Sequence, residues 1–361
     1  MGHLFVVFLE MYLFWRWRDL RVHSHLAIAA GALILLLVDS TVAGVRAGSP
    51  PAAAAPPSLA SRHEVLSPRR GLRGELVVSG SGWLWLLARD GKHAHSLEQV
   101  DPRTEQIHSS TRVAGPASYL FYGAGRVWVT GGSTIRALDP RSGRLSVLRA
   151  AGGTVRSMTF ARSKAYAVVA GRDEVLAISP GRRLRAHTIV EHGGPSTAVA
   201  LSDAIEITNH RANLVPVIFP RADTSFLAAL QLGRAVIAAA GPQAAWVRRG
   251  HELVRETLSR AAGSASRPAR HYVDTLGRPE HVVMTADGGC YVSIGRTSGR
   301  ARRTDVLYFS RSALRSRHPR PSAVHRGPHV RSLALDPAGG VVFTDAVGDL
   351  VRWVPTVKSL R

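Results

Sequence analysis

Val127-Trp128-Val129, an apolar run with an aromatic centre, is one of seven similar runs in a chain of 361 residues. The other six are Leu84-Trp85-Leu86, Ala165-Tyr166-Ala167, Ala204-Ile205-Glu206, Ala245-Trp246-Val247, Cys290-Tyr291-Val292 and Val341-Val342-Phe343. The centres of successive runs lie 43, 38, 39, 41, 45 and 51 residues apart. A period of about 40 residues, with a short apolar strand in each unit, is typical of a radial β-repeat in which one sheet cannot bury its own faces.

Each unit carries further strand signals around its centre. A second apolar run precedes each centre, namely Leu76-Val77-Val78, Tyr119-Leu120-Phe121, Met158-Thr159-Phe160, Ala198-Val199-Ala200, Val236-Ile237-Ala238, Val282-Val283-Met284 and Leu333-Ala334-Leu335. Turns rich in glycine join the two runs, a third run ends at a proline turn such as Asp139-Pro140, and a fourth is weak and polar, as expected of an edge strand. The pattern therefore predicts an all-β fold, a seven-bladed β-propeller of four-stranded antiparallel blades.

The last unit is too short to be complete, because only 19 residues follow Val342. A ring of sheets needs a fourth strand at this place. We predict that a strand from the segment before Leu72, within His63 to Leu66, pairs with the last sheet and closes the ring from both ends of the chain.

The N-terminal part carries an export signal. Thirteen uninterrupted apolar residues run from Leu26 to Val38, and three arginines precede them. This order is typical of a signal peptide, with cleavage expected between Ala47 and Gly48, or at a weaker site after Ala43. An uncleaved signal anchor is the alternative, in which the hydrophobic helix stays in the membrane. The chain could start at Met1 or at Met11.

These signals divide the chain into three parts. Residues 1–47 form the signal peptide or signal anchor, and residues 48–71 form a linker rich in proline and alanine that includes the ring-closing strand. Residues 72–361 form the propeller. We expect the protein to be exported, either secreted or anchored to the membrane by its N-terminal helix, and otherwise not in contact with the membrane.

Basic residues outnumber acidic ones by 47 to 25, and only three of them are lysines. The surplus attracts anions, so an anionic polymer of the cell envelope is one candidate partner. The densest clusters are Arg182-Arg183-Leu184-Arg185 and Arg300-Ala301-Arg302-Arg303, and both are more simply read as solvated turns in a chain whose arginines are dispersed. No nucleic-acid partner is expected, because the aromatic residues occupy strand centres and do not alternate with basic ones.

Signals for catalysis are weak. Cys290 is the only cysteine and lies in an apolar run, which favours a buried thiol over a nucleophile. His93-Ala94-His95 follows Asp90-Gly91, so a solvated loop is favoured over a metal-binding strand. Other histidines near strand ends could meet at a mouth of the ring, which leaves a metal site open: His210, His251, His271, His281, His325 and His329. We predict no catalytic residue and no cofactor, and we expect a monomer.

Gly125-Arg126-Val127-Trp128-Val129-Thr130, followed by Ile135 to Leu145, resembles the YVTN-type β-propeller repeat, which is related to the NHL-type repeat. The resemblance implies seven blades over most of the chain after the linker. Gly277 to Val283 and Gly340 to Asp345 also resemble the streptogramin lyase branch, which uses a metal with histidine and glutamate at one mouth of the ring. That branch usually carries glutamate after Phe-Thr, where this chain has Asp345.

Two functions follow from these observations. The first is an exported, non-catalytic binding or scaffold module at the cell envelope, whose loops bind a protein or an anionic polymer. The second is a metal-assisted lyase or hydrolase of the streptogramin lyase type. We favour the binding module, because the residues that distinguish the second function are missing.

Overall fold

The structure is a computed structural model. It describes residues 62–66, 73–90, 94–149, 153–172, 174–191, 195–200, 205–209, 215–219, 224–228, 236–240, 244–249, 252–257, 271–273, 277–298, 301–316 and 319–355. The chain divides into two compact units, Met1–Ala54 and Ala55–Arg361. The first unit, with the predicted signal and the expected cleavage between Ala47 and Gly48, lies outside these residues.

The described part of the second unit is built from seven four-stranded antiparallel sheets. Sheet 1 contains β2 (Arg73–Gly80), β3 (Trp83–Asp90), β4 (Ala94–Val100) and β5 (Ile107–Val113). Sheet 2 contains β6 (Tyr119–Gly123), β7 (Arg126–Gly131), β8 (Thr134–Leu138) and β9 (Leu145–Arg149). Sheet 3 contains β10 (Thr154–Ala161), β11 (Lys164–Ala170), β12 (Glu174–Ser179) and β13 (Arg185–Glu191).

The remaining sheets follow the same order along the chain. Sheet 4 contains β14 (Pro195–Ala200), β15 (Ile205–Asn209), β16 (Val215–Phe219) and β17 (Thr224–Ala228). Sheet 5 contains β18 (Val236–Ala240), β19 (Ala244–Arg249), β20 (Glu252–Thr257) and β21 (His271–Val273). Sheet 6 contains β22 (Arg278–Met284), β23 (Cys290–Ser298), β24 (Ala301–Phe309) and β25 (Ala323–Pro328), with the 3-10 turn η2 (Ala313–Arg315) between the last two.

Sheet 7 joins both ends of the second unit. It contains β26 (Val330–Leu335), β27 (Val341–Asp345) and β28 (Leu350–Val354), and its outer strand is β1 (Arg62–Leu66). The two outer strands pair antiparallel, from Arg62 opposite Val354 to Leu66 opposite Leu350. The strand expected within His63 to Leu66 is thus present, and it closes the ring.

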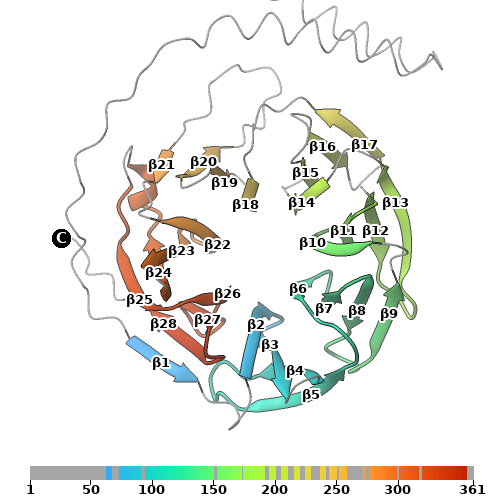
Figure 1. Ribbon diagram of the computed structural model, residues 1–361, viewed down its shortest axis with the longest axis horizontal. Coiled ribbons are helices and arrows are strands. Elements are labelled where there is room, and N and C mark those ends of the chain that lie inside the picture. The colour runs from blue at the N-terminus through green and yellow to red at the C-terminus, as the bar shows by residue number, and fades with distance from the viewer. Residues whose placement is uncertain are drawn as a thin grey trace, which may run out of the picture. The chain divides into compact units, whose positions relative to one another are not determined.

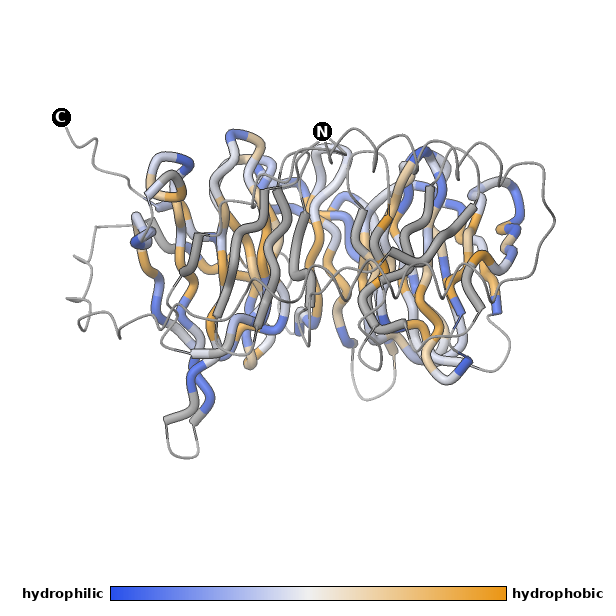
Figure 2. Tube along the Cα trace, turned by 90° about the horizontal axis from the view of Figure 1, so that it is seen from above, coloured by the Kyte–Doolittle hydropathy of each residue, from blue (hydrophilic) through white to orange (hydrophobic). Residues whose placement is uncertain are grey.

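The sheets surround a common axis (Figure 1), and the first strand of each sheet lies innermost. Each first strand contacts the first strand of the next sheet, in the order β2, β6, β10, β14, β18, β22, β26 and back to β2. This closed series of contacts is the architecture of a β-propeller, as the sequence predicts. The hydrophobic segments lie in the middle of the strands and the hydrophilic ones at both ends (Figure 2).

The core consists of apolar layers between neighbouring sheets. The predicted strand centres lie on the second strand of each sheet, and Trp85, Trp128, Tyr166 and Tyr291 are buried there. Each of the four belongs to a cluster that also contains residues of the next sheet, such as Trp128 with Val155 and Met158. The aromatic side chains are therefore used for packing between sheets, as the sequence predicts.

Polar contacts also join neighbouring sheets at their inner strands. The Ser332 hydroxyl of β26 donates to the carbonyl oxygen of Val77 at 3.0 Å and accepts from the N–H of Val77 at 3.2 Å. The Ser157 hydroxyl of β10 accepts from the N–H of Ala198 in β14 at 3.1 Å. These bonds satisfy backbone groups that no strand of the same sheet can reach, and they hold adjacent blades in register.

Candidate functional site

The two ends of the sheets form two different surfaces. Because successive strands are antiparallel, the beginning of each first strand lies at the same end as the turn between the second and third strands. We call this end the bulge side. The turns after the first and third strands lie at the opposite end, which we call the turn side. Contacts confirm the arrangement between sheets, since Gly74 at the start of β2 donates to Gly348 in the turn between β27 and β28 at 2.8 Å.

The first strands carry an extra residue near the bulge side. In six of the seven described first strands the pairing with the second strand skips one position, which is the signature of a β-bulge. The bulged residues are Glu75, Arg156, Ser196, Ala238, Glu280 and Arg331. Bulges redirect side chains and are common beside functional sites. We call these six positions the bulge rim.

Glu280 is the centre of a polar cluster between sheets 6 and 7. The guanidinium of Arg302 donates to Oε1 of Glu280, and Nδ1 of His329 lies 3.6 Å from Oε2. The same ring nitrogen lies 3.1 Å from the hydroxyl of Thr304, which accepts the N–H of Val330 at 3.0 Å. Two charged residues of β22 and β24 are thus connected to the loop that begins the next sheet.

The environment of His329 favours its neutral form. Burial and the positive charge of Arg302 lower the pKa of the imidazole below its ordinary value, although the Glu280 carboxylate acts in the opposite direction. The charge of Arg331 adds to the lowering. Acidification would therefore add a proton to an imidazole that already lies close to two guanidinium groups.

Glu75 occupies the same position in sheet 1. Nε of Arg89 lies 2.9 Å from Oε1 of Glu75, and Nε2 of His95 lies 3.2 Å from Oε2. His95 is buried, and although it is this close to the carboxylate, neither ring nitrogen makes a hydrogen bond of good geometry. Sheets 6 and 1 thus carry the same three residue types, one bulged glutamate with one arginine and one histidine.

The ion pairs of the bulge side share one arrangement. In the pair of Glu280 and Arg302 the side chain of the arginine is 60% exposed and that of the glutamate 12%. The arginine side chain is also more exposed than its carboxylate partner in three other pairs, Arg89–Glu75, Arg172–Glu174 and Arg296–Asp305. The carboxylates lie inside and hold guanidinium groups that face the solvent. Because these arginines are held by partners, less side-chain entropy is lost when a ligand binds them.

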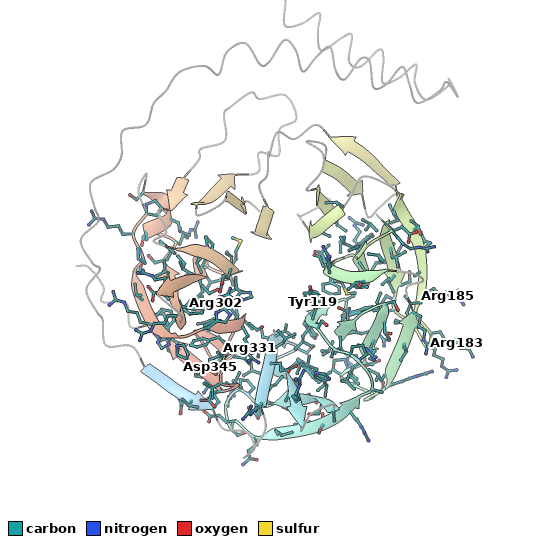
Figure 3. All side chains as sticks on the ribbon, viewed as in Figure 1. Tyr119, Arg183, Arg185, Arg302, Arg331 and Asp345 are labelled. Atoms are coloured by element: carbon teal, nitrogen blue, oxygen red, sulfur yellow. The ribbon has the colours of Figure 1, made fainter. Side chains whose placement is uncertain are left out.

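Figure 3 shows where the labelled arginines lie. Arg302 and Arg331 lie beside the inner strands, whereas Arg183 and Arg185 extend from the outer edge of the ring. Arg331 is exposed, and its guanidinium donates to the carbonyl oxygen of Ala346 at 2.9 Å. The arc from Glu280 through Arg331 to Glu75 crosses three consecutive sheets, and it is the candidate binding site.

On the turn side between sheets 7 and 1, the ion pairs differ from those of the bulge side, because their arginine, Arg352, is buried. Arg352 is surrounded by the carboxylates of Asp336, Glu105 and Glu64, at 2.5, 3.0 and 3.7 Å. Its guanidinium also donates to the carbonyl oxygen of Pro102. A cavity of about 350 Å³ is lined in part by Arg352, Glu105, Glu64 and Pro102. The contacts join four segments of two sheets, so Arg352 has a structural role at the place where the ring closes.

The predicted histidines do not all meet. His329 lies beside Glu280, whereas the ring of His325 packs against Phe343 and Trp353, with centroids 5.3 and 5.7 Å apart. The backbone N–H of His281 donates to the hydroxyl of Ser293 at 3.0 Å, and the side chain of His281 is half-buried. His210 and His251 lie outside the described residues. No group of three histidine, cysteine, aspartate or glutamate residues that could hold a metal is found in the part of the chain that the structure describes.

Three other sequence-based interpretations can be compared with the structure. His95 is buried on β4, which begins at Ala94, so the solvated loop expected around it is wrong. Cys290 is buried, as predicted. Oδ1 of Asp345 accepts the N–H groups of Val347, Gly348 and Asp349, each at 2.9 Å, which fixes the turn between β27 and β28.

Sequence reasoning missed Glu75 and Glu280. Their signal is an Arg-x-Glu-x-Val-Val pattern, which occurs from Arg73 to Val78 and again from Arg278 to Val283. In both copies the glutamate is the extra residue of a bulge. A search for polar residues at equal distances before the apolar runs would have found this pair.

Comparisons with known proteins support the fold. No protein-family model matches the chain, and no curated protein matches it. Among solved structures, a chain of Kuenenia stuttgartiensis hydrazine synthase is similar with a TM-score of 0.54 and 13% identity, over 80% of this chain and 98% of that one. A chain of the mitotic checkpoint complex is similar with a TM-score of 0.55 and 10% identity, over 87% of this chain and 100% of that one. Both are β-propeller proteins, and at this identity the likeness concerns the fold alone.

Among the described residues, no helix has the length and apolar character needed to cross a membrane.

Proposed function

We propose that the chain is a non-catalytic binding module of the cell envelope. We also propose that the bulge rim binds a protein partner by recognising acidic side chains of that partner. The observation that carries this proposal is the arrangement of the ion pairs, in which internal carboxylates hold exposed guanidinium groups on one side of the ring. A planar guanidinium can form two parallel hydrogen bonds with a carboxylate. Arg302 and Arg331 are the central residues of the site.

The position of the site on the fold supports the same conclusion. The rim is made of strand ends and loops on a rigid ring, which is where binding residues are commonly placed. Each bulged residue is held by the ladder on both sides of it, so the geometry is set before the ligand arrives. The rim has mixed charge, with partly buried acidic and exposed basic groups, which favours a specific acidic segment over general attraction.

The test is a titration of the full chain with an octapeptide of glutamate. The NMR signal of the His329 ring is the readout of binding. This signal is assigned with the variant His329→Gln, and it reports the rim alone because the imidazole lies beside Glu280 and Thr304. In the wild type we expect a saturable shift. The double variant Arg302→Ala and Arg331→Ala should weaken the apparent affinity about tenfold, which corresponds to the loss of charge-assisted hydrogen bonds.

A matched control has the same change of net charge on the turn side. Arg311 and Arg320 are exposed there, and replacing both by alanine should leave the titration of His329 unchanged. An equal loss of affinity in both double variants, or no shift of the His329 signal in the wild type, would show that the rim does not recognise acidic segments.

The finer assignments are part of the same proposal. We assign the repeats to the YVTN-type propellers, a relationship supported by the pattern from Gly125 to Leu145 and the four-stranded sheets. We also propose export, supported by the apolar run from Leu26 to Val38. The metal-assisted lyase or hydrolase is the alternative function, and the metal content of the purified chain tests it.

A further inference from the structure

We infer that the turn side carries a second binding surface, on sheets 2 and 3, for a linear polymer with a phosphate group in each repeat. Four turns make up this surface, at residues 123–126, 139–145, 161–164 and 179–185. Its exposed basic residues, which we call the turn patch, are Arg141, Arg144, Arg162, Arg182, Arg183 and Arg185. The bulge side is the other end of these sheets, so this surface is distinct from the site proposed above.

The composition of the chain does not account for the charge of these turns. They contain eight basic residues and one acidic residue, Asp139, whereas the whole chain has 47 basic and 25 acidic residues. On the same side of the ring, the turns of sheets 7 and 1 at residues 79–83, 100–107 and 335–341 contain one basic residue, Arg103, and three acidic ones, Asp101, Glu105 and Asp336. Of these two neighbouring parts of the turn side, sheets 2 and 3 therefore carry the positive charge and sheets 7 and 1 do not.

The one acidic residue does not neutralise the patch. Oδ1 of Asp139 accepts the N–H groups of Arg141 and Ser142, at 3.0 and 3.4 Å, and so fixes its own turn. Burial raises its pKa, but these two hydrogen bonds and the charge of Arg126 outweigh burial, so the net pKa is below the ordinary value. The remaining carboxylate oxygen lies 3.7 Å from Arg126, whose side chain is largely buried. The six exposed arginines have no acidic partner among the ion pairs of the described residues.

The patch is held together across the two sheets. Nη2 of Arg126, the first residue of β7, donates to the carbonyl oxygen of Gly181 in the turn between β12 and β13, at 3.4 Å. Phe160 of sheet 3 packs on Gly123 so closely that a methyl group at this glycine would overlap its ring. The six arginines thus lie on one connected group of turns, which we call the track, and together they offer more donors than a single phosphate group requires.

The chemistry of the track favours a phosphate polymer over other anionic partners. None of the exposed large hydrophobic side chains of the described residues lies in these turns, and Leu184 is buried. A protein interface has an apolar core, and single-stranded nucleic acid is usually held by stacking on aromatic residues. Arginine forks bind phosphate oxygens in pairs, so repeated phosphates can use the track without other contacts.

The experiment measures binding of the full chain to inorganic polyphosphate as a function of salt. The triple variant Arg182→Ser, Arg183→Ser and Arg185→Ser should lower the affinity about tenfold or more, and should reduce the slope of log affinity against log salt by about 2, since each lost contact removes about 0.7. The matched control, Arg73→Ser, Arg311→Ser and Arg326→Ser, removes three exposed arginines elsewhere and should keep the affinity. An equal loss in both variants, or a loss in neither, would overturn the proposal.

Two further arms distinguish the source of the phosphate. Vesicles of phosphatidylglycerol and a single-stranded oligonucleotide are titrated at the same phosphate concentration, and both should bind more weakly than polyphosphate. If vesicles or the oligonucleotide bind more tightly than polyphosphate, and the triple variant loses this binding, the ligand of the patch is a membrane or a nucleic acid and not a phosphate polymer. The rim variant Arg302→Ala and Arg331→Ala should bind polyphosphate like the wild type, so failure of one proposal does not imply failure of the other.

Discussion

Arg352 and Asp336 form a buried ion pair, in which Nε of the arginine lies 2.5 Å from Oδ2 of the aspartate. Asp336 belongs to the turn between β26 and β27, and Arg352 to β28, which pairs with the ring-closing strand β1. Glu105, from sheet 1, is a second partner of the same guanidinium at 3.0 Å. One arginine therefore connects the last sheet with the first at the point where a ring could open.

We predict that Asp336→Asn lowers the free energy of unfolding by about 3 kcal/mol. The amide keeps the size of the side chain and can still accept the N–H of Ala338, but it leaves a buried guanidinium with weaker compensation, and breaking a buried pair costs about 3–5 kcal/mol. Glu105 and Glu64 remain close to Arg352, so the expected cost lies at the lower end of this energy range. Denaturant unfolding measures it.

The control for this prediction is Arg172→Ala. This arginine is paired with Glu174 at 3.6 Å but is 46% exposed, so its loss should cost less than about 1 kcal/mol. Equal costs for the two substitutions would contradict a special role of the pair at the closure of the ring.

We predict that Gly80→Ala destabilises the contact between sheets 1 and 2 by about 1–3 kcal/mol. A methyl group at position 80 would overlap the ring of Tyr122, which packs on this glycine from the next sheet, and overpacking costs energy of this size. In the double variant Gly80→Ala and Tyr122→Ala the two costs should not add, because removing the ring makes room for the methyl group. Additive costs, measured by denaturant unfolding, would mean that the two residues do not interact.

The fold was predictable where each unit repeats the same physical requirement. Trp85 and Trp128 occur in apolar runs because each second strand is buried between two sheets. The regular spacing of the apolar runs along the sequence follows from this burial. The strand from Arg62 to Leu66 was predictable by elimination, because the last unit lacks a strand. No such rule applies to His95, because the Asp-Gly turn signal before it does not show that a strand begins as early as Ala94.

The candidate site was harder to predict because it depends on one-residue shifts. A bulge at Glu280 changes the direction of a side chain without changing the apolar pattern around it. The pairing of Glu280 with Arg302 joins residues 22 positions apart, and no periodicity reports it. The turn patch was present in the sequence as Arg182-Arg183-Leu184-Arg185, but its continuation to Arg141 and Arg144 needed the neighbouring sheet.

We predict that acid destabilises the protein partly through His329. The pKa of this imidazole is lower in the folded chain than its ordinary value of 6.5, first because of burial and then because of Arg302. The unfolded state therefore binds the proton more tightly, so the contribution of this group to stability is complete above the unfolded pKa and falls as the pH drops toward the folded one. Unfolding at about pH 8 and about pH 5 should show a smaller acid-induced loss in His329→Gln than in the wild type.

The same prediction can be tested without unfolding. In Arg302→Ala the pKa of His329, measured by NMR, should rise toward 6.5, because a lowering positive charge is removed and the Glu280 carboxylate remains. An unchanged pKa would show that Arg302 does not act on this histidine.

We predict that Val65→Pro makes the protein associate. Val65 lies in β1 opposite Val351 and its side chain is 48% exposed, so proline, whose ring fixes φ at about −65° and disturbs the extended backbone, should weaken the pairing of β1 with little loss of packing. With β1 detached, β28 becomes an exposed edge that can pair with another chain. Sedimentation should show association that increases with protein concentration, whereas Val65→Thr, which keeps the N–H group and suits a strand, should sediment like the wild type. A variant that sediments unchanged would mean that β1 is not needed to cover this edge.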